Sequence, residues 1–162
     1  MRLQRSDELL RLLRAGGFEF ILIGGVAANL HGANHATFDV DVLMPFTREN
    51  WAKALEALEP LKPTFHGHAG RIALHDKADA LVDYRMVLLD TALGRLDLMP
   101  AIPGGTYAEL VPRAITVTAF GGPLTVLSLD DLIFSKASLG REKDKVAVLE
   151  LRAIRDRLRA EP

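Results

Sequence analysis

Residues 18–44, FEFILIGGVAANLHGANHATFDVDVLM, contain the pattern on which the fold assignment rests. The apolar run at 18–23 is β-branched and aromatic and predicts a buried strand, whereas residues 26–30 read as a short helix. Gly24 and Gly25 stand between them. Glycine lets the backbone come close to a ligand, and the free N–H groups at a helix N-terminus attract phosphate oxygens. The stretch therefore predicts a diglycine bend suited to phosphate.

A strand with one acidic face is expected next, over residues 38–44. Phe38 and Val40 lie on one predicted face, and Asp39 and Asp41 lie on the other, because alternate side chains of a strand point the same way. Two anions so close together are destabilising unless a cation or a proton lies between them. The pattern indicates a site for a hard, oxygen-seeking cation such as Mg²⁺.

A third carboxylate is available on a later predicted strand, residues 94–99. Asp97 alternates there with Leu96 and Leu98, so its side chain is expected to face away from the core. We expect it to join the first two carboxylates and complete a site for metal. Asp83 is the competing choice for this position.

Further elements are expected from periodicity and capping residues. They are helices near residues 9–13, 48–58, 128–139 and 142–158, and strands near 71–74, 84–89, 115–120 and 124–127. The order predicts an α/β (α+β) fold with a mixed β-sheet flanked by helices.

A single domain is expected over residues 1–162, with a core at about 18–128 and a C-terminal helical segment at about 129–160. The last helix has a predicted packing stripe of four apolar residues, Val146, Leu149, Ile154 and Leu158.

The amino-acid composition excludes several kinds of site. The 162 residues include no cysteine, which excludes disulfides, zinc–thiolate sites and cysteine nucleophiles. The formal net charge of -1 provides no overall basic field for nucleic acid. No signal peptide is visible, and the longest apolar stretch is shorter than the roughly 20 residues that a membrane span needs. We therefore expect a cytoplasmic protein with no membrane partner.

The segment from Gly24 to Asp41 resembles the signature of the minimal nucleotidyltransferases. Many of these belong to toxin–antitoxin systems, including the AbiEii-like toxins. Later segments look similar to the same family, namely Leu96–Pro100, residues 126–133, Lys136 and residues 140–144. The resemblance spans roughly residues 18–150, and the combination of Gly-Gly with Asp-x-Asp is its most specific part.

The resemblance implies a nucleotidyltransferase fold and a metal-dependent reaction. A nucleoside monophosphate would pass from a nucleoside triphosphate to a hydroxyl of an RNA end, a protein or a small molecule. A partner protein of a toxin–antitoxin pair is also implied. By this resemblance the triphosphate would contact Gly24, Gly25 and Lys136, and Mg²⁺ or Mn²⁺ would be held by the catalytic residues Asp39, Asp41 and Asp97.

One departure from the family favours a different function. The family often has arginine two residues before the threonine that precedes the acidic pair, and here that position is His35. Histidine is shorter and only partly charged at neutral pH. The alternative is therefore a weak or inactive module that binds or regulates. A metal-dependent phosphohydrolase ranks below both, as does a zinc site built from scattered histidines such as His66 and His68.

Overall fold

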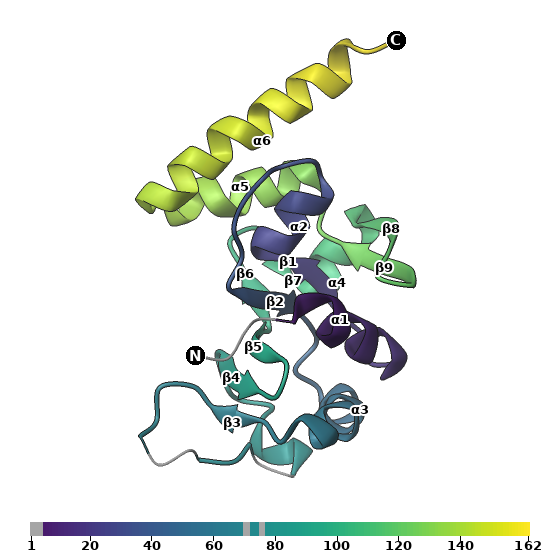
Figure 1. The fold of residues 1–162 in the computed structure, drawn as a ribbon, viewed down its shortest axis with the longest axis vertical. Helices are drawn as coiled ribbons and strands as arrows, with labels where there is room; N and C mark the ends of the chain where they lie inside the picture. Colours follow the sequence, from purple (N-terminus) through teal and green to yellow (C-terminus); the bar gives the residue numbers. More distant parts are fainter. Residues whose placement is uncertain (1–4, 70–71, 75–76) are drawn as a thin grey trace.

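The computed structural model describes residues 5–69, 72–74 and 77–162. Its main sheet runs in the order β3-β4-β5-β2-β1-β9-β8 (Figure 1). The strands are β1 (Ile21–Ile23), β2 (Asp39–Leu43), β3 (Thr64–Phe65), β4 (Val87–Thr91), β5 (Gly94–Met99), β8 (Ile115–Ala119) and β9 (Gly122–Val126). The pairs β1–β9 and β2–β5 are parallel and the others are antiparallel, so the sheet is mixed, as expected.

Helices lie against this sheet and at one end of it. They are α1 (Ser6–Ala15), α2 (Gly24–Leu30), α3 (Arg48–Leu58), α4 (Tyr107–Leu110), α5 (Leu129–Leu139) and α6 (Glu142–Ala160). Short 3₁₀ turns and a small ribbon complete the described elements: η1 (Glu59–Leu61), η2 (Ala78–Ala80), η3 (Val111–Arg113), β6 (Ala101–Ile102) and β7 (Gly105–Thr106). In Figure 1, α5 and α6 lie beyond α2, and the C-terminal end of α6 points away from the sheet.

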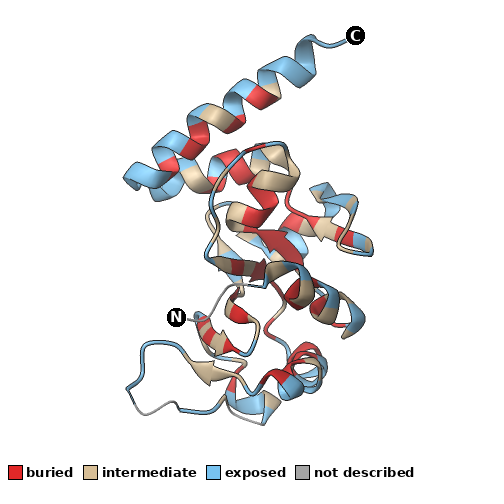
Figure 2. Cartoon of the chain, viewed as in Figure 1, coloured by how far each residue is buried: buried red, intermediate tan, exposed pale blue. Residues whose placement is uncertain are grey.

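The core is centred on β1, β2 and β5, which Figure 2 shows as largely buried. The inward residues alternate along each strand, as Val40 and Val42 do on β2 and Leu96 and Leu98 on β5, and all four are fully buried. Helix α2 packs on β1 and β2, and α5 packs on α2 and α6. The other face of β2 and β5 carries the charged residues of these strands, and the N-terminal end of α2 lies against it.

Local signals place several helix ends where the sequence predicts them. The Thr47 hydroxyl accepts a hydrogen bond from the backbone N–H of Asn50 and caps α3. Ser128 caps α5 in the same way through the N–H of Asp131, and Gly140 ends α5 in the left-handed conformation. Among the described residues, no helix is both long and apolar enough to cross a membrane.

Some expectations are wrong in position. The strand expected at 84–89 begins only at Val87, and the run at 18–23 pairs only from Ile21. Of the segment 71–74, Arg71 lies outside the described residues, and Ala73 forms an isolated bridge to Thr64.

The face of α6 that packs on the protein also differs from the prediction. Val146 and Leu149 are 65% and 70% exposed, and Leu158 is exposed too, whereas Val148 and Leu151 are buried. Of the predicted stripe only Ile154 is buried. The helix is apolar on two sides, and the position of α5 decides which side is covered.

This packing predicts unequal effects for two leucines of α6. Leu151→Ala should lower the free energy of unfolding by about 2–5 kcal/mol, because it leaves a cavity in a buried interface. Leu149→Ala, the matched control on the exposed side, should change it by no more than about 0.5 kcal/mol. Urea denaturation measures both, and equal losses would contradict the observed helix orientation.

Candidate functional site

Parallel pairing of β2 with β5 brings three carboxylates together. The register sets Asp39 opposite Arg95 and Asp41 opposite Asp97, and all four side chains share one face because their positions alternate with the buried valines and leucines. One oxygen from each of Asp39, Asp41 and Asp97 lies within 4.8 Å of the others. The gathering expected from the sequence is therefore present. Asp83, the competing choice, is exposed and not in this group.

Burial and mutual repulsion make this acidic trio unfavourable without a cation. Burial, followed by the charges of Asp39 and Asp97, raises the pKa of Asp41 to about 7. Burial likewise raises the pKa of Asp97, which is only 7% exposed, although Arg95 opposes the shift. Like charges this close favour either a shared proton or a bound cation.

The trio fits a divalent metal ion by the chemistry of its donors. Three carboxylate oxygens within mutual reach of one cation are the hard ligands that Mg²⁺ and Mn²⁺ prefer. Asp39, Asp41 and Asp97 are the residues that would hold it. Among the described residues, no other group of three or more acidic or histidine side chains gathers in this way.

The diglycine bend is packed against the same carboxylates. Gly24 has φ +71°, and a Cβ there would lie 2.2 Å from Oδ2 of Asp41. A Cβ on Gly25 would lie 2.7 Å from the Cγ2 atom of Thr37. A larger residue at Gly24 would collide with the Asp41 carboxylate, and one at Gly25 would collide with Thr37. The glycines are thus required for the close approach of α2 to β2.

A cavity of about 580 Å³ opens over the trio and the bend. Its lining includes Gly24, Gly25 and the three aspartates, and on another side Lys136 from α5 and Arg141 from the start of α6. Phe38 lines it as well. The sequence predicts Phe38 on the buried face with Val40, but β2 begins at Asp39 and Phe38 is 78% exposed. The cavity thus has one acidic side, one basic side and an apolar margin.

A buried carboxylate holds the basic side in place. Asp144 is 1% exposed and accepts hydrogen bonds from Arg141, with Nε 2.5 Å from Oδ2 and Nη2 3.2 Å from Oδ1. Burial would raise the pKa of Asp144, but Arg141 and Lys136 lower it below its usual value. Burial lowers the pKa of Lys136, and Asp144 and Asp41 oppose that shift. Sequence reasoning missed this arrangement; its only signal was Arg141 three residues before Asp144.

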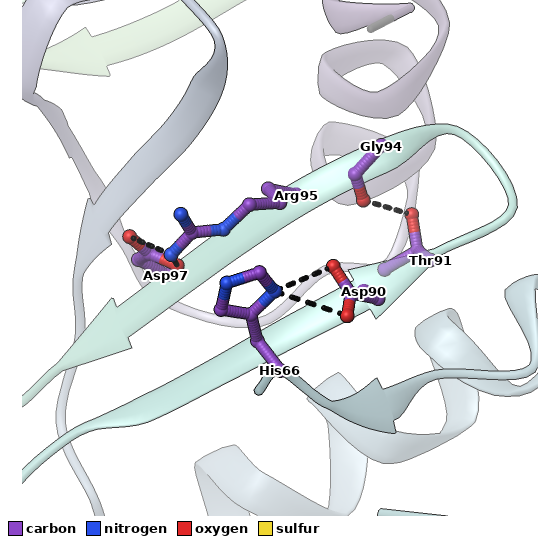
Figure 3. Close-up of polar contacts among 6 residues, drawn as sticks. All are labelled: His66, Asp90, Thr91, Gly94, Arg95 and Asp97. Atoms are coloured by element: carbon purple, nitrogen blue, oxygen red, sulfur yellow. Dashed lines mark hydrogen bonds and ion pairs between the residues drawn. The ribbon is translucent and has the colours of Figure 1, made fainter. Parts of the chain in front are cut away.

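The histidines are dispersed and have separate partners. His35 is engaged by α6, with Nε2 2.9 Å from Oε2 of Glu150, and His31 contacts the carbonyl of Leu127. His66 directly follows β3 and lies beside β4, where its Nδ1 is 2.9 Å from Oδ1 of Asp90 (Figure 3). Among the described histidines none joins a metal-binding group, which leaves the zinc alternative without support.

Comparison with solved structures shows the fold. A lincosamide antibiotic adenylyltransferase (LnuA), bound to lincomycin, matches with TM-score 0.58 and 15% identity over 95% of this chain and 99% of its own. A putative nucleotidyltransferase from Thermotoga maritima matches with TM-score 0.54 and 17% identity over 99% and 98%. ANT(2″)-Ia in complex with adenylyl-2″-tobramycin gives 0.51 and 18% over 91% and 97%.

No family model and no curated protein sequence matches the chain. At these sequence identities, similarity to the solved structures shows the fold and nothing about the activity. The chain therefore has a nucleotidyltransferase fold, as expected, and its activity has to be argued from the site.

The raised pKa of Asp41 predicts a pH-dependent stability. Between its ordinary value of 3.8 and about 7, the folded protein holds a proton that the unfolded chain has released, so wild-type stability falls as pH rises through this window. Asp41→Asn removes this loss. In EDTA the variant should match wild type near pH 4 and exceed it by on the order of 1–3 kcal/mol at pH 8.

Denaturant unfolding at several pH values measures this difference. Asp83→Asn is the exposed control and should show no such trend. An Asp41→Asn variant no more stable than wild type at pH 8 would show that the trio is not strained without metal.

Proposed function

We propose that this chain transfers a nucleoside monophosphate from a nucleoside triphosphate to a hydroxyl acceptor. The observation that carries the proposal is the acidic trio, which lies beside the diglycine bend in one cavity with a basic side. A divalent cation held by Asp39, Asp41 and Asp97 would orient the attacking oxygen and offset the charge of the departing pyrophosphate. Each aspartate would act as a metal ligand and would be catalytic in that sense.

The other cavity residues serve the triphosphate. Gly24 and Gly25 leave the backbone open to phosphate oxygens, since a Cβ on Gly24 would intrude at Asp41 and one on Gly25 at Thr37. Lys136 and Arg141 line the same cavity and carry the positive charge that a polyphosphate requires. Asp144 holds Arg141 through two hydrogen bonds, which limits the orientations available to the guanidinium. His35 lines the same cavity, but its Nε2 is paired with Glu150, so we assign the phosphate contacts to Lys136 and Arg141.

A small hydroxylated molecule is the acceptor class that we propose first. The cavity volume of about 580 Å³ is in the range of small-molecule sites, and the net charge of -1 offers no general attraction for RNA. Two structural neighbours are described with lincomycin and with adenylyl-2″-tobramycin, which supports the same class. An RNA end and a protein hydroxyl are the other acceptors to be tested.

The resemblance to toxin–antitoxin nucleotidyltransferases supports a second part of the proposal, a cytoplasmic role beside a partner protein. A non-catalytic binding module is the alternative function. His35 favours it, because it stands in this cavity where the family often has arginine and its Nε2 is paired with Glu150.

The decisive assay uses each of the four ribonucleoside triphosphates, labelled at the α-phosphate, with Mg²⁺ or Mn²⁺. Lincomycin, tobramycin, total RNA and the chain itself are offered as acceptors. We expect label transfer, and we expect Asp39→Ala and Asp97→Asn to reduce its rate by more than about 100-fold. Even the loss of a residue that only supports a metal ligand lowers metal affinity or activity about 10–100-fold. Asp83→Asn should be unaffected.

Two results would count against transfer. Metal-dependent triphosphate binding without transfer to any acceptor would favour the binding module. Release of inorganic phosphate without an acceptor would favour a phosphohydrolase.

The buried carboxylate of α6 gives an independent prediction. Asp144→Asn should weaken triphosphate binding about tenfold, because Arg141 loses a charged hydrogen-bond partner worth roughly 1.5 kcal/mol. Glu142→Gln breaks an exposed ion pair with Lys145 on the same helix and should bind as wild type does. Titration calorimetry with a non-hydrolysable analogue measures both. Equal affinities for the two variants would remove Arg141 from the phosphate site.

A further inference from the structure

The face of the sheet that carries the acidic trio also has an apolar surface. Leu88 of β4 lies opposite Asp97 in the strand register, and Met99 follows Asp97 by two residues on β5, so both share its face. Met86, two residues before Leu88, lines the same cavity as the other two and is 49% exposed. Together, Met86, Leu88 and Met99 are termed the apolar shelf.

The acidic trio lies between the shelf and the basic side of the cavity. A Cβ on Gly24 would touch Asp41, and the pKa of Asp41 is raised by burial and by its neighbouring aspartates but lowered by Lys136, so the bend and Lys136 lie toward β2. Asp97 stands between Asp41 and Leu88 across the strands. In Figure 1, β4 lies on the other side of β2 and β5 from α5 and α6. The shelf therefore begins where the trio ends.

The geometry of transfer reserves the shelf for the acceptor. When the departing pyrophosphate contacts Lys136 and Arg141, in-line attack requires the acceptor oxygen on the opposite side of the α-phosphorus. The bond from this oxygen to phosphorus forms as the bond to pyrophosphate breaks. An acceptor hydroxyl near Asp97 leaves the remainder of that molecule over the apolar shelf.

The charges around the cavity restrict the acceptor further. Of the described lining residues, four are carboxylates: the trio, which the cation would engage, and Asp144, which accepts hydrogen bonds from Arg141. None of these four is left to pair with a polycation. Methionine is unbranched and polarisable, and it adapts to apolar ligands of different shapes. An aliphatic or aromatic skeleton therefore fits this surface, whereas a skeleton with several ammonium groups does not.

We propose that the apolar shelf selects the acceptor, which is an uncharged or singly charged small molecule whose hydroxyl is carried by an aliphatic or aromatic skeleton. The inference rests on the proposed function and names the substrate class of the same site. Polycationic acceptors and the polyanionic end of an RNA are the classes that it excludes.

The test observes methionine methyl groups by NMR in protein labelled with [methyl-¹³C]methionine and saturated with Mg²⁺ and α,β-methylene-ATP. Of the four methionines, Met86 and Met99 report from the shelf, and the fully buried Met44 is the internal control. Met86→Leu and Met99→Leu assign the signals. Uncharged hexyl β-glucoside and singly charged lincomycin should shift both shelf signals, and polycationic tobramycin should leave them in place.

A charge introduced on the shelf should change this selectivity. Met86→Glu alters a half-exposed residue, and it should weaken binding of hexyl glucoside about tenfold and allow tobramycin to shift the Met99 signal. Leu149→Glu makes the same kind of change at an exposed apolar residue outside the cavity lining. This matched control should bind all three probes as wild type does.

Three results would overturn the inference. In the wild type, these are shelf signals that tobramycin shifts, shelf signals that neither hexyl glucoside nor lincomycin shifts, and shelf signals that move with the triphosphate analogue and no further with either acceptor. The last would place the nucleoside on the shelf. If titration calorimetry detects no Mg²⁺-dependent binding of the analogue, the proposed function itself fails and the inference fails with it.

Discussion

The parallel pairing of β2 with β5 is the constraint on which the site depends. It places Asp41 directly opposite Asp97, an arrangement of like charges that a sheet ordinarily avoids. The buried faces of the same strands fix the register, because Val40, Val42, Leu96 and Leu98 would turn outward if either strand slipped by one residue. The hydrophobic core thus enforces an electrostatic strain on the opposite face, which a cation would relieve.

The surrounding helices keep the three carboxylates close together and leave a cavity in which a ligand can reach them. Gly24 brings α2 so close to Asp41 that a side chain there would collide with the carboxylate. The packing of α5 on α2 and α6 carries Lys136 and Arg141 to the same cavity. One region therefore combines strained anions, an approachable backbone, Lys136 and an Arg141 held by the buried Asp144. A metal–triphosphate complex has the complementary charges.

The sequence could predict what depends on local rules. Successive side chains of a strand point to opposite faces. This alternation alone predicts that Asp39 and Asp41 share one face, and that Asp97 points to the other face from Leu96 and Leu98. Caps at Thr47 and Ser128 follow from neighbours within three residues.

Long-range choices could not be predicted in this way. Val146 and Val148 are equally apolar, and only the location of α5 buries one and exposes the other. The pairing of His66 with Asp90 joins residues far apart in the chain. The most direct test of the central claim is a crystal structure with Mn²⁺ and a non-hydrolysable triphosphate. The account predicts anomalous density among the oxygens of Asp39, Asp41 and Asp97, with the phosphates toward Lys136. Manganese bound elsewhere, with no metal among these three carboxylates, would contradict it.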